Sequence, residues 1–277
     1  MLKIKNMSKT FNKNTVNENP LFNDFSLNIK EGEFVSVIGS NGAGKSTLLN
    51  IIAGEIKEDE GKIIIDNVDM SKKAEFIRNR TIGRVFQDPS LGVSPKMTIL
   101  ENLSLADNKG KKFDLSFLID RKRINHYKEI LSEVNLGLED KIETKVKFLS
   151  GGQRQALTLL MAVMGKPKIL LLDEHTAALD PKTSVNIMDI TRKIIKKNRI
   201  TTLMVTHNLK NAIDNGNRLI MLHEGKVVID LDRKEKENLD VEKLFGLFEK
   251  VNVKNDLSSE LIFSLKSKKN NPICDKI

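Results

Sequence analysis

The chain has 277 residues, of which 39% are hydrophobic and 30% charged, and its formal net charge is +9. At the usual ~150 residues per domain, this length allows one large α/β domain or two lobes, and the composition excludes disorder as the main state. A single cysteine, Cys274, excludes disulfide frameworks and cysteine zinc sites, and without a signal-peptide pattern or an apolar run near ~18 residues we expect a cytosolic chain.

The first third of the chain predicts strands followed by a helix. Apolar and polar residues alternate over 2–7 and 25–29, which indicates half-buried antiparallel strands. The run 34–38, bounded by glycines, is typical of a strand buried on both faces. Helical spacing over 46–53 predicts a helix that stops at Gly54. Further strands are expected at 63–65 and 82–86.

The remaining segments alternate helices with strands. After Pro89 the pattern is mostly helical, from about residue 98 to 164. Strand patterns resume later, and the last two form a hairpin across Glu224 and Gly225. A charged tail beyond Arg233 carries one apolar helical face, near Leu244, Phe245, Leu247 and Phe248. Strands separated by helices imply an α/β fold with a largely parallel sheet. The resumed strands are 169–172, 202–205, 219–222 and 227–229.

A phosphate-binding loop lies between the buried strand and the helix that follows it. Residues 39–47 fit the pattern GxxxxGK[ST], whose glycines let backbone N–H groups converge on a β-phosphate at the positive end of the helix. Lys45 would reach the β and γ oxygens, and the Ser46 hydroxyl would ligate magnesium. The nucleotide-binding residues expected here are Gly39, Ser40, Asn41, Gly42, Ala43, Gly44, Lys45, Ser46 and Thr47.

Two adjacent carboxylates end a later buried strand. The run 169–172 ends in Asp173, which a phosphate-loop protein needs for its magnesium ion. Glu174 follows at once and could accept a proton from an attacking water, as a general base must. The two residues therefore predict a metal ligand and a catalytic base.

A second glycine-rich turn precedes another helix. In the sequence LSGGQ, over 149–153, Ser150 is placed to cap a helix expected over 154–164, with the amides of Gly151 and Gly152 facing an anion. LSGGQ, the phosphate loop, the ILLLDE strand, Gln87 and His207 together resemble the ATP-binding cassette (ABC) ATPases, over roughly residues 1–230.

The resemblance implies further roles for matching residues. Gln87 would touch magnesium and the attacking water, and His207 would contact the γ-phosphate. Asp180 would lie in a loop that crosses a dimer interface, and Phe11 would stack on adenine, with core packing of Phe11 left open as an alternative. The signature residues that would contact the nucleotide are Ser150, Gly151, Gly152 and Gln153; the magnesium ligands would be Ser46, Gln87 and Asp173; the catalytic residues would be Glu174, His207 and Gln87.

The resemblance also implies the organisation of the chain. We expect a P-loop NTPase core with a mainly parallel sheet, an N-terminal antiparallel β subdomain and an inserted helical lobe. The cassette would span residues 1–232, with the lobe at about 89–164, and 233–277 would be a short charged tail. His126, His175 and His223 are interpreted as surface or packing residues.

Some positions depart from the common family pattern. His175 follows Glu174 where proline is frequent, and Ala177 stands where serine is frequent. These residues, with GRVFQDP at 83–89, look like the small bacterial amino-acid importer ATPases. Neither departure changes a residue that would bind phosphate or metal or transfer a proton. The departures therefore bear only on which subclass of ABC ATPases the chain resembles.

The predicted function is the ATP-binding subunit of a transporter. Two copies would bind ATP and Mg²⁺ head to tail, at the cytoplasmic face of the membrane, and drive separate permease subunits that work with an extracellular solute-binding protein. The dispersed positive charge, with no tryptophan and one tyrosine, favours a solvated surface over nucleic acid. Attraction to an anionic membrane face or to nucleotides remains an alternative. Two rival functions are a soluble cassette acting on ribosomes or DNA and a regulator of cell-wall enzymes.

Overall fold

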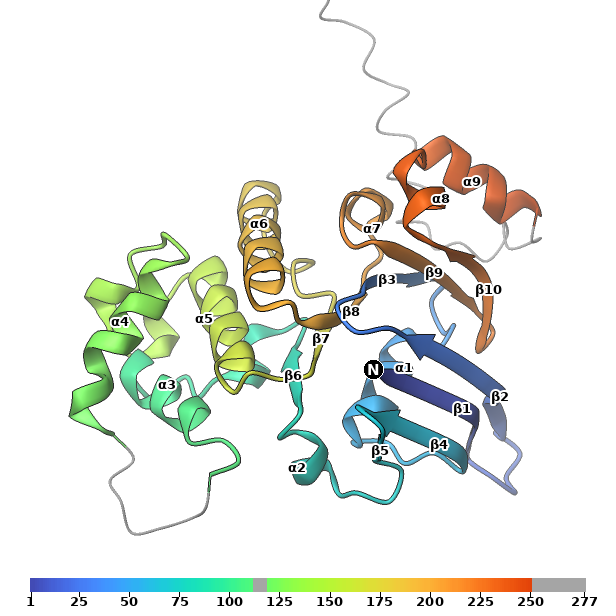
Figure 1. Cartoon of the computed structure of the whole chain (residues 1–277), viewed down its shortest axis with the longest axis horizontal. Coiled ribbons are helices and arrows are strands. Elements are labelled where there is room, and N and C mark those ends of the chain that lie inside the picture. The colour runs from blue at the N-terminus through green and yellow to red at the C-terminus, as the bar shows by residue number, and fades with distance from the viewer. Residues whose placement is uncertain (112–118, 251–277) are drawn as a thin grey trace, which may run out of the picture. The chain divides into compact units, whose positions relative to one another are not determined.

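The computed structural model describes residues 1–111 and 119–250, and the chain divides into two compact units (Figure 1). The first unit is Met1–Lys72 with Leu203–Ile277, and the second is Lys73–Thr202. Cys274 and the end of the predicted tail lie outside the described residues. The boundaries that we expected at 89–164 and 233–277 remain predictions.

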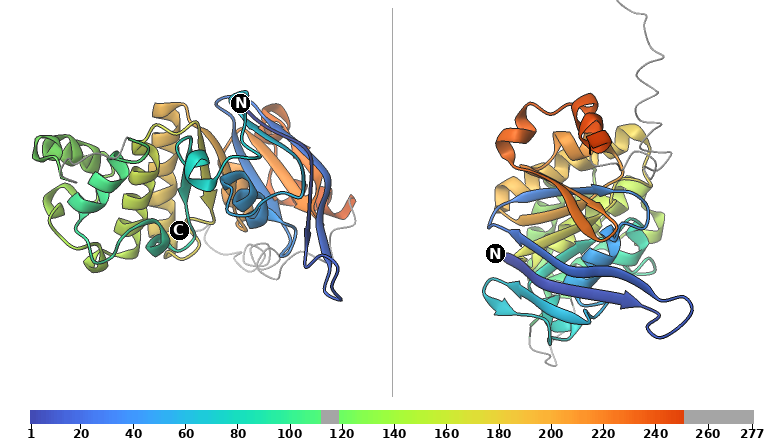
Figure 2. Two further views of the ribbon diagram at one scale, coloured as in Figure 1. Left: turned by 90° about the horizontal axis from the view of Figure 1, so that it is seen from below. Right: turned by 90° about the vertical axis from the view of Figure 1, so that its right-hand side faces the viewer.

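The first unit begins with an antiparallel sheet whose strand order is β2-β1-β4-β5. Leu2 pairs with Ile29 on one side and Ile65 on the other. Leu2, Ile4 and Met7 are at most 2% exposed while residues 3, 5 and 6 between them are exposed, which confirms the predicted half-buried strands. The β1–β2 hairpin is the long blue ribbon in Figure 2. The strands are β1 (Leu2–Phe11), β2 (Asn19–Ile29), β4 (Glu60–Ile65) and β5 (Val68–Asp69).

Further strands of the first unit surround β3, a strand buried along its whole length as predicted. β3 runs parallel to β9, and β9 forms the expected hairpin with β10, in which His223 pairs with Lys226. β3 also neighbours β8, a strand whose last residues belong to this unit. The elements are β3 (Phe34–Gly39), α1 (Lys45–Ala53), β8 (Thr201–Val205), α7 (Leu209–Asp214), β9 (Arg218–His223) and β10 (Lys226–Leu231).

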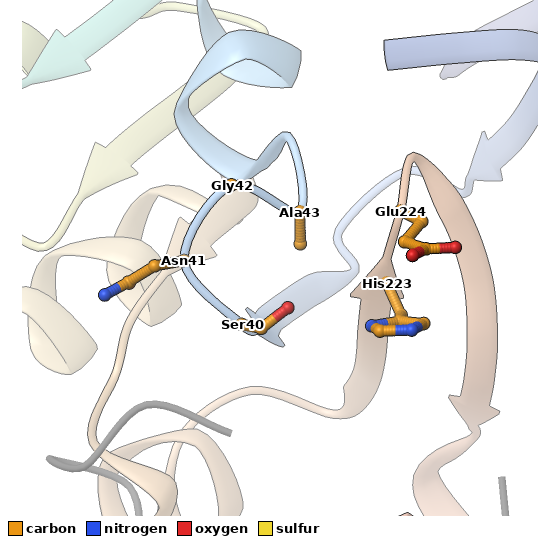
Figure 3. Close-up of a pocket in the computed structure, with 6 residues that line it drawn as sticks. All are labelled: Ser40, Asn41, Gly42, Ala43, His223 and Glu224. Carbon is orange, nitrogen blue, oxygen red and sulfur yellow. The ribbon is translucent and has the colours of Figure 1, made fainter. Parts of the chain in front are cut away.

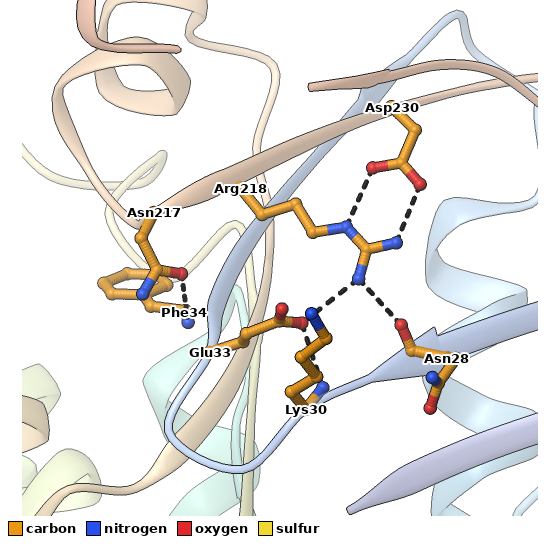
Figure 4. A network of polar contacts seen from close by, with 7 residues as sticks. All are labelled: Asn28, Lys30, Glu33, Phe34, Asn217, Arg218 and Asp230. Carbon is orange, nitrogen blue, oxygen red and sulfur yellow. Dashed lines mark hydrogen bonds and ion pairs between the residues drawn. The ribbon is translucent and has the colours of Figure 1, made fainter. Parts of the chain in front are cut away.

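Arg218 joins three segments of the first unit (Figure 4). Its Nε and Nη2 donate to the Asp230 carboxylate at 2.8 and 2.7 Å, and its Nη1 donates to the Asn28 carbonyl at 2.7 Å and to Glu33 at 3.1 Å. The hydrogen bonds that the guanidinium donates to Asp230 raise its pKa further, so it stays charged. A bidentate pair of this kind fixes geometry as well as adding energy. Arg218 therefore ties β9 and β10 to the end of β2.

The C-terminal helices of the first unit are α8 (Arg233–Glu237) and α9 (Val241–Lys250). Leu244 and Phe248 of α9 are fully buried in a cluster with Leu219 and Met221 of β9. This confirms the apolar helical face expected there, because residues four apart lie on one side of a helix. Helix α9 therefore belongs to the core of the first unit.

The second unit combines one parallel strand pair with helices. β6 and β7 run parallel, with Ile82 opposite Ile169 and Val85 opposite Leu172. Helix α3 begins with a capping box of Thr98 and Glu101, as the helical pattern from residue 98 predicts. The elements are α2 (Glu75–Arg78), β6 (Ile82–Val85), α3 (Ile99–Asp107), α4 (Ile124–Ser132), α5 (Gly151–Met164), β7 (Ile169–Asp173) and α6 (Pro181–Asn198).

Both units agree with the predicted fold class. The chain is mixed α/β, with an antiparallel sheet at its N-terminal end and parallel pairing between β3 and β9 and between β6 and β7. Across residues 1–111 and 119–250, no helix has the length and apolar character that crossing a membrane requires.

Candidate functional site

The phosphate loop connects β3 to α1 in the first unit. Lys45, the first residue of α1, is only 6% exposed, and its Nζ donates to the carbonyls of Gly39 and Ser40 at 2.8 Å each. These bonds hold the ammonium group against the loop that precedes it. Ser46, the next residue, is exposed at the start of the helix. The loop thus presents one positive charge and one hydroxyl.

The amino end of α1 has no side-chain cap. Gly44 occupies the N-cap position with φ +98°, and no acidic residue lies in the first turn. A Cβ at Gly44 would be 2.8 Å from the Phe22 ring, so both the backbone conformation and the packing require glycine. Backbone N–H groups of an uncapped first turn, with the helix dipole, suit an anion such as a phosphate.

A pocket of about 290 Å³ lies beside this loop (Figure 3). The loop residues Ser40 to Ala43 line it, and so do His223 and Glu224 from the β9–β10 turn. The amide of Gly225 donates to the Ala43 carbonyl at 3.3 Å, which attaches the turn to the loop. The sequence showed only a hairpin turn here, and neither His223 nor Glu224 carried a signal for this position.

His207 lies in the first unit, two residues after β8. The amide of Thr206 donates to the Val37 carbonyl of β3 at 3.1 Å, so His207 follows a residue bonded to the strand that leads into the phosphate loop. Asn208 then caps α7 by accepting from the Asn211 amide at 2.9 Å. This cap fixes the backbone on the far side of His207.

Phe11 is the last residue of β1 and is partly exposed. The Lys9 Nζ lies 5.4 Å from the centroid of its ring. Asp59 holds this strand end, because its carboxylate accepts from the Thr10 amide at 2.7 Å and from Lys9 at 3.2 Å. The Phe11 ring is therefore set in a fixed strand end next to a cation.

The second unit carries the two carboxylates. Asp173 ends β7, and its Oδ2 lies 3.8 Å from Nη2 of Arg84 on the neighbouring strand β6. The Arg84 guanidinium lies over the Phe86 ring at 4.5 Å from its centroid. Sequence reasoning missed Arg84, although a charged residue inside an apolar strand was a usable signal. Glu174 follows in a left-handed conformation, with φ +45°.

His175 is a packing residue, as predicted. It is 2% exposed, and its Nε2 lies 3.2 Å from Oγ1 of Thr191 in α6. Burial lowers the pKa of the ring to about 4, so it is neutral at neutral pH. Asp180, further along, caps α6 by accepting from the Thr183 amide at 3.0 Å, and the hydrogen bonds of Thr183 lower the pKa of its carboxyl.

The LSGGQ segment starts α5, which begins at Gly151 and not at residue 154 as expected. Ser150 and Gln153 form a capping box with two hydrogen bonds of 3.2 Å, and this cap draws both glycines into the first turn. A Cβ at Gly152 would be 2.4 Å from Cγ2 of Thr183, which explains the glycine there. Ser150 and Gly151 are exposed, and the amides of Gly151 and Gly152 lie outside the capping box.

Gln87 is exposed just after β6. The backbone beside it is held by α5, because Nε2 of buried Gln155 donates to the Phe86 carbonyl at 3.4 Å. Asp88 accepts from the Ser90 amide at 2.8 Å, which lowers the pKa of the Asp88 carboxyl. Helix α5 therefore contacts the Gln87 loop as well as presenting LSGGQ.

The residues predicted to hold magnesium offer hydroxyl, amide and carboxylate oxygens, namely Ser46, Gln87 and Asp173. Oxygen donors of this kind suit a hard cation that completes its shell with phosphate oxygens and waters. Within the described part of the chain, no three or more His, Cys, Asp or Glu side chains gather as a metal site. Each of these donors by itself suits magnesium, and their grouping into one site stays a prediction.

Comparisons with known proteins identify what the chain is similar to. Residues 22–177 match the family model described as "ABC transporter". The chain is 54% identical over 249 residues to the Tyrosine transport ATP-binding protein of Clostridioides difficile (strain R20291), covering 90% of this chain and 99% of that protein. It is 34% identical to the Energy-coupling factor transporter ATP-binding protein EcfA2 of Clostridium tetani (strain Massachusetts / E88), covering 83% of this chain and 78% of that one.

Solved structures of ATP-binding cassettes also resemble this chain. The dimeric post-hydrolysis structure of the ATP-binding cassette MJ0796 bound to ADP and Pi matches with a TM-score of 0.72 and 35% identity, over 84% of this chain and 99% of that one. The ADP conformation of the cassette MJ1267 matches with a TM-score of 0.74 and 26% identity, over 90% of this chain and 98% of that one.

Proposed function

Because this chain belongs to the ABC transporter family and is the ATP-binding, ATP-hydrolysing subunit of a transporter, we propose that it powers import of an amino acid through separate permease subunits. The observation that carries the proposal is the 54% identity, over 90% of the chain, to a protein named for tyrosine transport. The subunit would act at the cytoplasmic face of the membrane, with an extracellular solute-binding protein delivering the solute.

Two copies of the chain would bind ATP between them. The uncapped end of α1 with Lys45 offers a full set of groups for phosphates, whereas the capped end of α5 offers the Ser150 hydroxyl proton and the amides of Gly151 and Gly152. These few groups at α5 would add to a nucleotide that is already bound at the phosphate loop of another copy. The similar cassette MJ0796 is dimeric, which supports the pairing of two copies, and we propose that they pair head to tail.

Hydrolysis would use the residues that the sequence motifs predict. Lys45 and the α1 amides would bind the β- and γ-phosphates, His207 would contact the γ-phosphate, and Phe11 would stack on adenine. Magnesium, when bound by Ser46, Gln87 and Asp173, would neutralise the charge that develops on the phosphates.

Glu174 would accept a proton from water as the water oxygen attacks the γ-phosphorus. The bond from that phosphorus to the β–γ bridging oxygen breaks, and ADP leaves with the electron pair of that bond. Asp180 would contact the other copy near its nucleotide, as the family resemblance implies. Loss of the γ-phosphate would then weaken the interface between copies and reset the permease.

The test replaces the proposed base. Glu174→Gln keeps the shape of the side chain but removes the basic carboxylate, so phosphate release should slow by the ~10²–10⁴-fold typical of a lost general base. Binding of MgATP should survive, and the dimer population in size-exclusion chromatography should rise with MgATP. Asp173→Asn is the matched variant, and it should weaken MgATP binding instead. Normal hydrolysis by Glu174→Gln would refute the assigned base.

The import proposal has its own test. The tagged chain is expressed in its source cells, and membranes are extracted with a mild detergent. Co-purification of a multispan permease, whose assembled complex hydrolyses ATP faster with an amino acid and solute-binding protein present, is the expected result. A complex whose only partners are cell-wall enzymes or ribosomes would contradict import.

A further inference from the structure

The segment between β7 and α6, residues 174–180, begins with an unusual backbone conformation. Glu174 has φ +45°, in the left-handed region that side chains other than glycine rarely adopt. Such a conformation persists only where the surrounding structure holds it. Glu174 is also the proposed catalytic base, so whatever holds its backbone also sets the point from which its side chain extends.

Contacts on both sides of Glu174 help to hold this backbone. The Ala177 amide donates to the Glu174 carbonyl at 2.9 Å and closes a turn. The side chain of His175 then enters the interior, where it is 2% exposed and lies 3.2 Å from Thr191 Oγ1, which is itself 0% exposed. Thr191 lies in the middle of α6, a helix of 18 residues, so the contact attaches the turn to a long rigid element.

The direction of the hydrogen bond follows from the hydroxyl of Thr191. Its one proton is donated to the Ile187 carbonyl at 2.7 Å. The oxygen therefore accepts from His175, which must carry its proton on Nε2. A neutral imidazole supplies this single N–H and keeps an acceptor at Nδ1. Removing either side chain breaks this hydrogen bond, although Thr191 would still donate to Ile187 if His175 were replaced.

We propose that His175 is a positioning residue for ATP hydrolysis, because its hydrogen bond to Thr191 holds Glu174 in the left-handed conformation that aims the carboxylate. This rests on the proposed function, in which Glu174 is the base. Proline, which is frequent in the family at this place, donates no hydrogen bond. In this chain the hydrogen bond from His175 to α6 holds the start of the segment instead. Asp180, which caps α6, holds its end.

The test uses two substitutions at Thr191 that separate hydrogen bonding from shape. Thr191→Val keeps the shape but removes the acceptor, so kcat for MgATP should fall about 10-fold or more with KM unchanged, since a misplaced catalytic group lowers the rate and not ground-state binding. Thr191→Ser keeps the hydroxyl and should retain kcat. Phosphate release by the full chain gives both constants, and the unfolding midpoint shows that each variant is folded.

The same experiment in the Glu174→Gln background shows whether His175 acts through Glu174. There Thr191→Val should change the remaining rate by less than about 2-fold, because the base it would misplace is already gone. An equal loss in both backgrounds would overturn the proposal. Wild-type kcat in Thr191→Val, with Glu174→Gln slow, would also overturn it while leaving the proposed base intact. Normal hydrolysis by Glu174→Gln would instead remove the proposed base, and with it this role.

A second pair decides the matter if Thr191→Val does not fold. His175→Gln retains an N–H donor of similar reach, whereas His175→Ala retains none. The Gln variant should recover most of the kcat that the Ala variant loses, again with KM unchanged. Equal kcat in the two variants would overturn the proposal.

Discussion

Two helices of this protein begin at a glycine-rich turn, α1 at the phosphate loop and α5 at LSGGQ, yet their amino ends are built differently. At α1 the N-cap is Gly44 in a left-handed conformation, which has no side chain to cap the helix. At α5 the N-cap is Ser150, whose hydroxyl accepts from Gln153 while the Gln153 side chain accepts from the Ser150 amide. The amino end of α1 therefore has no cap of its own. The amino end of α5 is partly closed by hydrogen bonds between Ser150 and Gln153.

Because α1 and α5 differ in capping although both follow glycines, glycines before a helix do not by themselves define a phosphate site. A side-chain cap takes up amides that an anion would otherwise bind, so the presence of a cap decides how much of a site the helix offers. In the proposed function the end of α1, with buried Lys45, would bind the phosphates. The end of α5, with a hydroxyl proton and two amides outside its capping box, would complete the site of another copy.

The largest effect should come from the buried Lys45 ammonium at the α1 end. Lys45→Ala should lower the rate of ATP hydrolysis about 10²-fold or more, because one preorganised donor to the transferring phosphate is lost. Phosphate release at saturating MgATP measures this, with circular dichroism to show that the variant folds. The control is Lys226→Ala, which removes an equal charge at an exposed position. Equal rates in the two variants would show that Lys45 contributes no more to hydrolysis than an exposed lysine does.

An intermediate effect is expected from a methyl group added at each turn. Gly44→Ala should lower the free energy of unfolding by about 2–4 kcal/mol, because its φ of +98° is strained for alanine and its Cβ would be 2.8 Å from the Phe22 ring. Gly151→Ala is the matched change at α5, where the added Cβ meets Leu179 at an ordinary 3.4 Å. It should leave stability within about 0.5 kcal/mol of wild type, or raise it. Urea unfolding measures both, and equal losses would contradict the contrast.

The smallest effect should come from the cap that only α5 has. Ser150→Ala removes the acceptor of the Gln153 amide, so the free energy of unfolding should fall by about 1 kcal/mol. Ser150→Asn supplies another capping oxygen and should recover most of this loss. Chemical denaturation of the three proteins decides it. If Ser150→Ala is as stable as wild type, the capping box contributes nothing to the free energy of unfolding, and the two helix ends do not differ in this respect.

The sequence predicted most of the local structure, because local patterns decide it. Alternation over 2–7 and helical spacing over 46–53 gave a strand and a helix that the structure confirms. The start of α5 was placed too late, since a capping box draws the residues after it into the first turn. Arg84 beside Asp173 was not anticipated, because pairing between β6 and β7 joins residues far apart in the chain.

What the sequence alone determined is the chemistry: which residues carry a phosphate-binding loop, a paired carboxylate and a signature turn, and hence the family. Motif spacing encodes these features because each is made by consecutive residues. The tertiary structure decided how those residues are held. A buried contact between His175 and Thr191 attaches the turn after Glu174 to α6, and the pocket beside the phosphate loop is lined by His223 from a distant hairpin. Both arise from packing between elements, which no local pattern records.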